Sequence, residues 1–234
     1  MQTARRMFMM AEMHGRDLLR RHFALLLLLA LPLTFYLSSS RTGRNAVTSG
    51  GVGMAFAIAG ATLFSTLSSA EVDQRLVLGG YRPIDLLVGR LFCLGPLGLV
   101  VATCFWLVMT GFSDAAKPWL VLLGICVVAL QSVPLGLAVG AGIGRELEGT
   151  LMIIGVVGIQ MAATPNSIVA KVLPFHEPQA LIRAGFDGHG AILYPLVITV
   201  LYGALMLTLA RMFLIPRLDV AAHRAQAEQA EATA

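Results

Sequence analysis

The charged side chains best placed for binding chemistry lie in two short segments between apolar runs. The first segment follows the second apolar run, and the second joins the fourth and fifth runs. They are Glu71, Asp73, Arg75, Tyr81 and Arg82 in the first segment, and Arg145, Glu146 and Glu148 in the second. Mixed charges of this kind pair with a complementary protein surface, so the pattern favours docking of a partner rather than catalysis.

The sequence lacks the common catalytic motifs. It contains no Gly-x-x-x-x-Gly-Lys-Ser/Thr, no His-Glu-x-x-His and no Gly-x-Ser-x-Gly. The two lysines, Lys117 and Lys171, do not fit a phosphate-binding loop, and His176 and His189 do not have metal-ligand spacing. We therefore expect a non-catalytic chain with no metal and no cofactor of its own.

Composition excludes a soluble globule. The chain has 234 residues, of which 57% are hydrophobic and 13% are charged, whereas an average soluble domain is about 45–50% apolar and about 25% charged. The three cysteines all lie in apolar runs, which argues against a disulfide scaffold. The net charge of +4 includes no basic run with interleaved aromatics, so we expect no nucleic-acid partner. A polytopic membrane protein remains.

Six apolar runs approach the ~20 residues that one spanning helix needs. They are residues 23–40, 47–69, 91–112, 118–144, 149–165 and 190–215. None holds an acidic residue, and Arg211 is their only strong base. We expect an all-α, six-span fold in one permease domain, with an amphipathic cytoplasmic helix over 1–22, the bundle over 23–215 and a polar, helical cytoplasmic tail over 216–234.

The distribution of positive charge orients these spans. Most of the 17 Lys and Arg residues lie in segments that are cytoplasmic if the N-terminus is inside. Positive charge near span ends marks the cytoplasmic side. Both termini are therefore predicted to be cytoplasmic, in a multi-pass protein of the cell membrane.

Two loops are predicted to carry structure of their own. In the first, residues 71–78 form two turns of helix with Val72 and Leu76 on one face and the charged residues in water; Gly79-Gly80 ends this helix, and Pro83 starts the next. In the loop before the last span, residues 166–173 and 178–186 form two short helices that dip into the outer leaflet.

Small residues recur every four positions on two spans. Gly136, Gly140 and Gly144 do so on the fourth, and the second carries a similar series that begins at Gly53. Such spacing lets helices approach closely. We expect close packing there, within the chain or between copies.

Taken together, this topology resembles the ABC type-2 exporter permeases. The first cytoplasmic loop carries the resemblance, with Glu71, Arg75 and Pro83 followed by the aliphatic run 86–91 that contains Gly89-Arg90. The usual Arg-Gly-Thr of that family is missing, and residues 73–76 (Asp-Gln-Arg-Leu) stand there instead.

The resemblance implies a partner and a path. A cytoplasmic ATPase dimer, which binds ATP and Mg, would dock on the charged residues of both segments, and the permease would pair with a second copy or a paralogue. The translocation path would follow the first, second and fifth spans. Its candidate residues are Phe35, Tyr36, Phe56, Phe64, Gln160, Met161 and Asn166. The expected substrate is a drug, a peptide or a lipid-like amphiphile.

Three other functions stay open. A haem-exporter-like subunit of cytochrome c maturation has the same size and span count. A non-transport membrane scaffold predicts that charge reversal at Glu71 or Arg75 leaves transport unchanged. A stand-alone secondary carrier is disfavoured, because the spans lack the ionisable groups that carry coupling charge.

Overall fold

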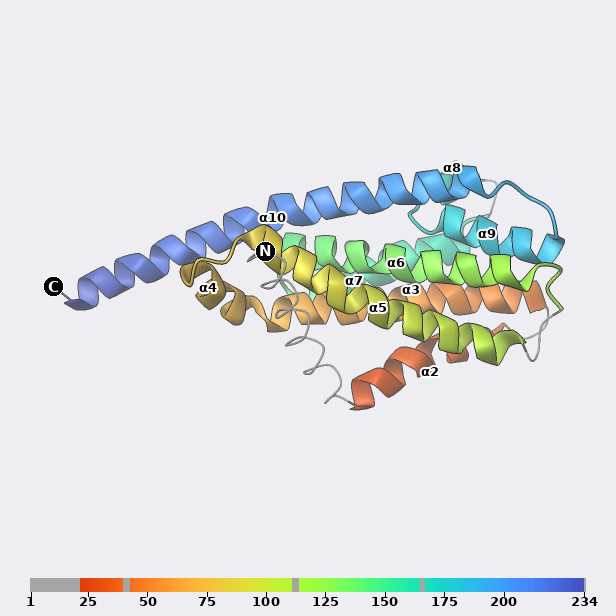
Figure 1. Ribbon diagram of the computed structural model, residues 1–234, viewed down its shortest axis with the longest axis horizontal. Coiled ribbons are helices and arrows are strands. Elements are labelled where there is room, and N and C mark those ends of the chain that lie inside the picture. Colours follow the sequence, from red (N-terminus) through yellow and green to blue (C-terminus); the bar gives the residue numbers. More distant parts are fainter. Residues whose placement is uncertain (1–21, 40–42, 111–113, 165–166, 234) are drawn as a thin grey trace, which may run out of the picture.

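The computed structural model describes residues 22–39, 43–110, 114–164 and 167–233, and every element within these ranges is a helix. In chain order the helices are α2 (His22–Ser38), α3 (Gly43–Ser68), α4 (Ala70–Leu78), α5 (Pro83–Thr110), α6 (Pro118–Ile143), α7 (Glu146–Ala162), α8 (Ile168–Val172), α9 (His176–Asp187) and α10 (Leu193–Thr233). In Figure 1, α4 lies at one end of the bundle and α8 and α9 lie at the other. The all-α prediction is confirmed for these residues. The predicted helix over 1–22, except His22, and Asn166 lie outside them.

Among the described residues, four helices are long and apolar enough to cross a membrane. They are Asn45–Ser68 of α3, Pro83–Met109 of α5, Pro118–Ile143 of α6 and Leu193–Leu218 of α10. The first and fifth predicted spans form α2 and α7, each 17 residues long and shorter than these four. The helices therefore support a membrane protein, while the six-span topology stays a prediction.

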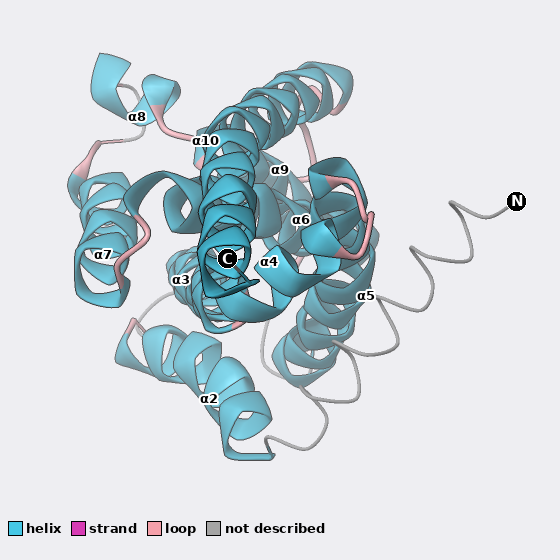
Figure 2. Cartoon of the chain, turned by 90° about the vertical axis from the view of Figure 1, so that its left-hand side faces the viewer, coloured by secondary structure: helices cyan, strands magenta, loops and turns pink. Residues whose placement is uncertain are grey.

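Helix α6 packs closely against α3 through two glycines. A Cβ atom on Gly136 would collide with the carbonyl oxygen of Ala59 and lie 2.7 Å from the Cβ atom of Thr62. A Cβ atom on Gly140 would lie 3.0 Å from that of Thr66. Figure 2 shows α3 and α6 in the middle of the bundle with α2, α5 and α7 around them. The predicted close packing is confirmed at Gly136 and Gly140, and it occurs within the chain, whereas Gly53 of the second-span series packs on the Phe35 side chain.

The α4–α5 connection has the predicted boundaries. Helix α4 ends at Leu78, and a turn over Gly79-Gly80 follows in which Gly80 has φ +86°. Helix α5 then begins at Pro83, as expected for a residue whose missing N–H is not needed there. The third span was predicted to begin at residue 91, but the helix of that span starts eight residues earlier and includes Arg90.

The opposite end of the bundle contains the two predicted short helices, α8 and α9. The Ser167 hydroxyl caps α8 by accepting a hydrogen bond from the Ala170 N–H at 3.1 Å. Helix α9 packs on α6, where a Cβ atom on Gly124 would lie 2.7 Å from Ile182 Cγ1. Helix α10 continues to Thr233, so the predicted helical tail and the last span form one continuous helix.

Candidate functional site

A buried ion pair fixes α4 to the bundle. Arg90, two turns into α5, pairs through Nη2 with the Asp73 carboxylate of α4 and also donates to the Ser69 hydroxyl. The side chains of Arg90 and Asp73 are only 1% and 2% exposed. A buried charge is costly unless it is paired and hydrogen-bonded. The pair therefore links α4 to α5.

The opposite face of α4 is open to solvent. Glu71, Val72, Gln74 and Arg75 are all exposed on this helix. The predicted facing of α4 is thus wrong in part, because Asp73 is buried while Val72 is 42% exposed. Asp73 faces the bundle because its counterion, Arg90, lies there.

Residues Tyr81 and Arg82 continue the surface next to α4. Arg82 is exposed and Tyr81 is half-buried against the apolar core. The N–H of Arg82 donates to the Asp85 carboxylate at 3.4 Å, which ties this turn to the start of α5. Of the five residues predicted in the first segment, all but Asp73 therefore present some of their surface to solvent.

The second predicted segment forms the junction between α6 and α7. Arg145 donates to the Glu148 carboxylate at 3.1 Å, and this pair is 78% and 45% exposed. The backbone N–H of Glu148, and then Arg145, hold the pKa of the Glu148 carboxyl below its ordinary value of 4.5. Glu146, in the first turn of α7, is also exposed.

Arg217 of α10 reaches across to the end of α6. Its guanidinium donates to the carbonyl oxygens of Gly140 at 3.4 Å and Gly142 at 3.5 Å. A cation at a helix C-terminus is favoured by the helix dipole and by the unpaired carbonyls. Gly144, which ends α6 with φ +66°, leaves room for this guanidinium, because a Cβ atom there would collide with it.

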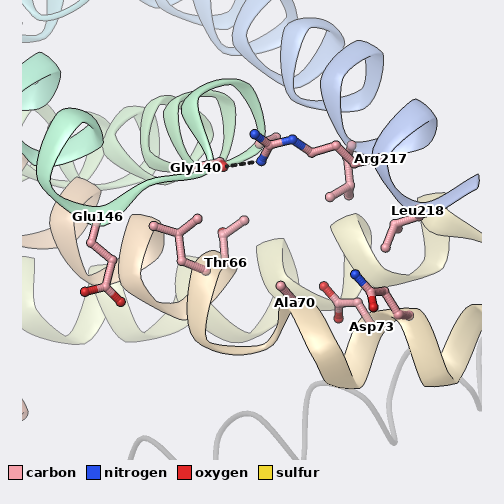
Figure 3. Close-up of a pocket in the computed structure, with 12 residues that line it drawn as sticks. Thr66, Ala70, Asp73, Gly140, Glu146, Arg217 and Leu218 are labelled. Atoms are coloured by element: carbon pink, nitrogen blue, oxygen red, sulfur yellow. Dashed lines mark hydrogen bonds between the residues drawn. The ribbon is translucent and has the colours of Figure 1, made fainter. Parts of the chain in front are cut away.

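Asp73, Glu146 and Arg217 line one cavity of about 450 Å³. Figure 3 shows Arg217 and Glu146 on different sides of it, with Thr66 and Asp73 from α3 and α4. Gln74 completes the polar lining, and the other lining residues are glycines, alanines and leucines. The structure therefore brings Asp73 and Glu146 of the predicted docking set to one place.

The predicted path residues do not behave as one group. Phe35 packs on Gly53, whose Cβ atom would lie 2.8 Å from its ring, and Tyr36 makes an edge-on contact with Phe105 at 6.3 Å between ring centres. These two side chains pack the helices of the bundle together. Phe64 and Met161, in contrast, are exposed.

The remaining described members of that set are Phe56 and Gln160. Phe56 is half-buried against the core. Gln160 is 5% exposed, and its Oε1 atom has no hydrogen-bond partner among the described residues.

A second cavity, of about 530 Å³, lies at the far end of the bundle. Lys171, His176, Glu177 and two tyrosines of α10 line it. Burial lowers the pKa of His176, although Glu177 opposes this effect with Nε2 and Oε1 3.9 Å apart. The part of the chain that is described holds no group of three His, Cys, Asp or Glu side chains able to bind a metal.

Sequence reasoning placed Arg90 in the motif of the resemblance and Ser69 in the small-residue series of the second span, but it gave neither of them, nor Arg217, a role in the site. The sequence held a signal for Arg90, because it is a single cation at the start of a long apolar run. Its acidic partner, Asp73, belongs to the short helix that precedes Gly79-Gly80. Arg217 gives no such signal, since its partners are backbone carbonyls of α6, about 75 residues away in the chain.

Comparison with known proteins adds no assignment: no family model, curated protein or solved structure matches this chain. The chain forms an apolar helical bundle that carries, at one end, an exposed two-turn helix fixed by a buried ion pair.

Proposed function

We propose that this chain is the membrane permease subunit of an ATP-driven exporter of the ABC type-2 class. The observation that carries the proposal is the construction of α4. A two-turn helix outside the apolar spans is held by the Asp73–Arg90 pair and turns Glu71 and Arg75 to solvent. A connector with no partner needs neither the buried pair nor the turn at Gly79-Gly80.

The rigid attachment of α4 suits the transfer of force. A partner ATPase that binds the exposed face of α4 would move the helix, and the Asp73–Arg90 pair would pass that movement to α5. Tyr81, Arg82 and the α6–α7 junction with Arg145, Glu146 and Glu148 extend the same docking surface. ATP and Mg would bind the partner, not this chain.

The surface of α7 supports a second permease copy. Four of its 17 residues are buried, and Leu151, Met152, Ile154 and Ile159 are exposed. Gly155 has open space around its Cβ position. Pairing along this helix would place Phe64, Gln160 and Met161 near the subunit interface, where an apolar path with few polar groups favours an amphiphilic substrate.

The experiment that tests the proposal is purification of the tagged chain from its native membranes in mild detergent. We expect a stoichiometric protein with a phosphate-binding-loop ATPase domain. Arg75→Glu should abolish its co-purification while the permease stays inserted. Lys117→Glu, the same charge reversal just before α6 at the far end of the bundle, should leave it unchanged.

Two results would contradict this function. One is the absence of any ATPase under conditions in which other ABC assemblies survive. The other is equal recovery of the ATPase with Arg75→Glu and with Lys117→Glu, which would remove α4 from the docking surface. Unchanged transport by Arg75→Glu would favour a membrane scaffold.

A further inference from the structure

The cavity between α3, α4, α6, α10 and the start of α7 lies at the level where three candidate spans end. Its lining includes Thr66, Gly144 and Leu218, and the corresponding spans end at Ser68, Ile143 and Leu218. Span ends lie near the boundary between hydrocarbon and headgroups. The cavity is therefore at the depth of a lipid headgroup.

The cavity offers one cation and one anion that are available to a ligand. The Arg217 guanidinium has five donors, and its two recorded bonds, to α6 carbonyls, are long at 3.4 and 3.5 Å. Glu146 is exposed, and its carboxylate makes no ion pair within the described residues. Asp73 also lines the cavity, but Arg90 already neutralises its charge.

The rest of the lining is apolar. Leu67, Leu214 and Leu218 contribute side chains, and alanines and glycines fill the remainder. A free polar metabolite gains nothing from this surface, whereas a molecule with an aliphatic stem does. Charges of both signs beside an apolar wall fit a zwitterionic amphiphile.

We propose that this cavity binds the headgroup of a phospholipid with a primary ammonium, of the phosphatidylethanolamine class. Arg217 holds the phosphate, since guanidinium groups suit phosphate oxygens. Glu146 accepts hydrogen bonds from the ammonium. The glycerol and first methylenes lie against the leucines, and the acyl chains leave along the exposed apolar face of α10. This binding does not depend on an ATPase partner.

Native mass spectrometry of the purified full chain tests the site. The probes are dioleoyl-phosphatidylethanolamine, dioleoyl-phosphatidylglycerol and dioleoyl-phosphatidylcholine, added singly at equal concentration. Wild-type protein should retain the ethanolamine lipid best. Arg217→Gln should weaken retention of all three about tenfold, as loss of a charge-assisted hydrogen bond does. Glu146→Gln should remove the preference for the ethanolamine lipid and spare phosphatidylglycerol.

Matched variants separate the site from general charge effects. Arg211→Gln on α10 and Glu148→Gln on α7 change exposed residues of the same type that do not line the cavity, so lipid retention should stay at the wild-type level. Arg217→Lys keeps the cation and should retain part of the binding. It also serves as the folded reference if Arg217→Gln aggregates.

Other outcomes overturn the proposal. Equal retention of the three lipids by wild type and by Arg217→Gln would mean that lipids only coat the apolar surface. Competition by soluble phosphoethanolamine as strong as by the lipid would assign the cavity to a free metabolite. Loss of binding with Arg211→Gln equal to that with Arg217→Gln would show a nonspecific charge effect.

Discussion

Two ion pairs between an arginine and a carboxylate lie at the same end of the molecule, but they differ in burial and in the elements that they join. Asp73–Arg90 joins α4 to α5 and is 1–2% exposed, whereas Arg145–Glu148 lies within one turn at the α6–α7 junction and is 78% and 45% exposed. Three of these four residues were expected to contact the same partner. The structure separates them into a pair that holds an element and a pair that is free to meet another protein.

The difference shows that charge pattern alone does not assign a role. Exposed pairs contribute little to stability because water and salt screen them. A buried pair stabilises little relative to apolar residues, yet removal of one member leaves an uncompensated charge. The buried pair should therefore control where α4 lies, and the exposed pair should control what α4 and its neighbours bind.

Loss of one buried partner should give the largest effect. Asp73→Leu leaves the Arg90 guanidinium buried without its counterion, and we expect a loss of about 3–5 kcal/mol in unfolding free energy. Thermal unfolding of the purified chain in detergent measures the loss. Glu71→Leu, two residues away on the exposed face, is the control and should change the midpoint little. Equal effects would mean that the buried pair does not hold α4.

Removal of both buried partners should recover most of that loss. The double variant Asp73→Leu with Arg90→Met replaces the pair by apolar side chains, which proteins often tolerate at little cost in stability. The same unfolding measurement should place the double variant well above Asp73→Leu alone. Its ATPase co-purification should nonetheless stay low, because α4 has lost its fixed position. A double variant no more stable than the single one would point to a packing defect.

Much of the local architecture was readable from sequence, since it depends on residues that act locally. Gly79-Gly80 and Pro83 gave the end of α4 and the start of α5, and Gly136 and Gly140 gave the close approach of α6 to a neighbour. The facing of α4 was not readable in this way. A two-turn helix has too few residues for periodicity to outweigh one buried counterion.

The candidate site was harder to predict from the sequence, because contacts between residues far apart in the chain define it. Arg217 lies on the last helix, and its recorded hydrogen bonds go to backbone carbonyls of α6, which carry no sequence signature. Phe35 and Tyr36 were plausible path residues as aromatics near a span end. Only the placement of Gly53 and Phe105 shows that they pack helices together.

Gly144 supports a third cation, Arg217, which is exposed and also donates to carbonyl oxygens at the end of α6. Gly144→Ala forces a side chain into a left-handed conformation and displaces the Arg217 guanidinium. We expect a loss of about 1–2 kcal/mol, measured by thermal unfolding. Gly155→Ala, in open helical space on α7, is the matched control and should be neutral or slightly stabilising. Equal losses would show that the Arg217 contact contributes nothing.

The smallest effect is expected at the exposed pair. The Glu148 backbone N–H and then Arg145 lower the pKa of the Glu148 carboxyl in the folded protein, so its contribution is fully present above the unfolded value of 4.5 and is lost as pH falls through the lower folded value. Glu148→Gln should leave the unfolding midpoint at neutral pH unchanged within error and make the decline below pH 4.5 slightly shallower. If it instead destabilised the protein at neutral pH as much as Asp73→Leu, exposure would not distinguish the two pairs. If it weakened ATPase co-purification without any change in stability, the division between a pair that holds α4 and a pair that meets the partner would become sharper.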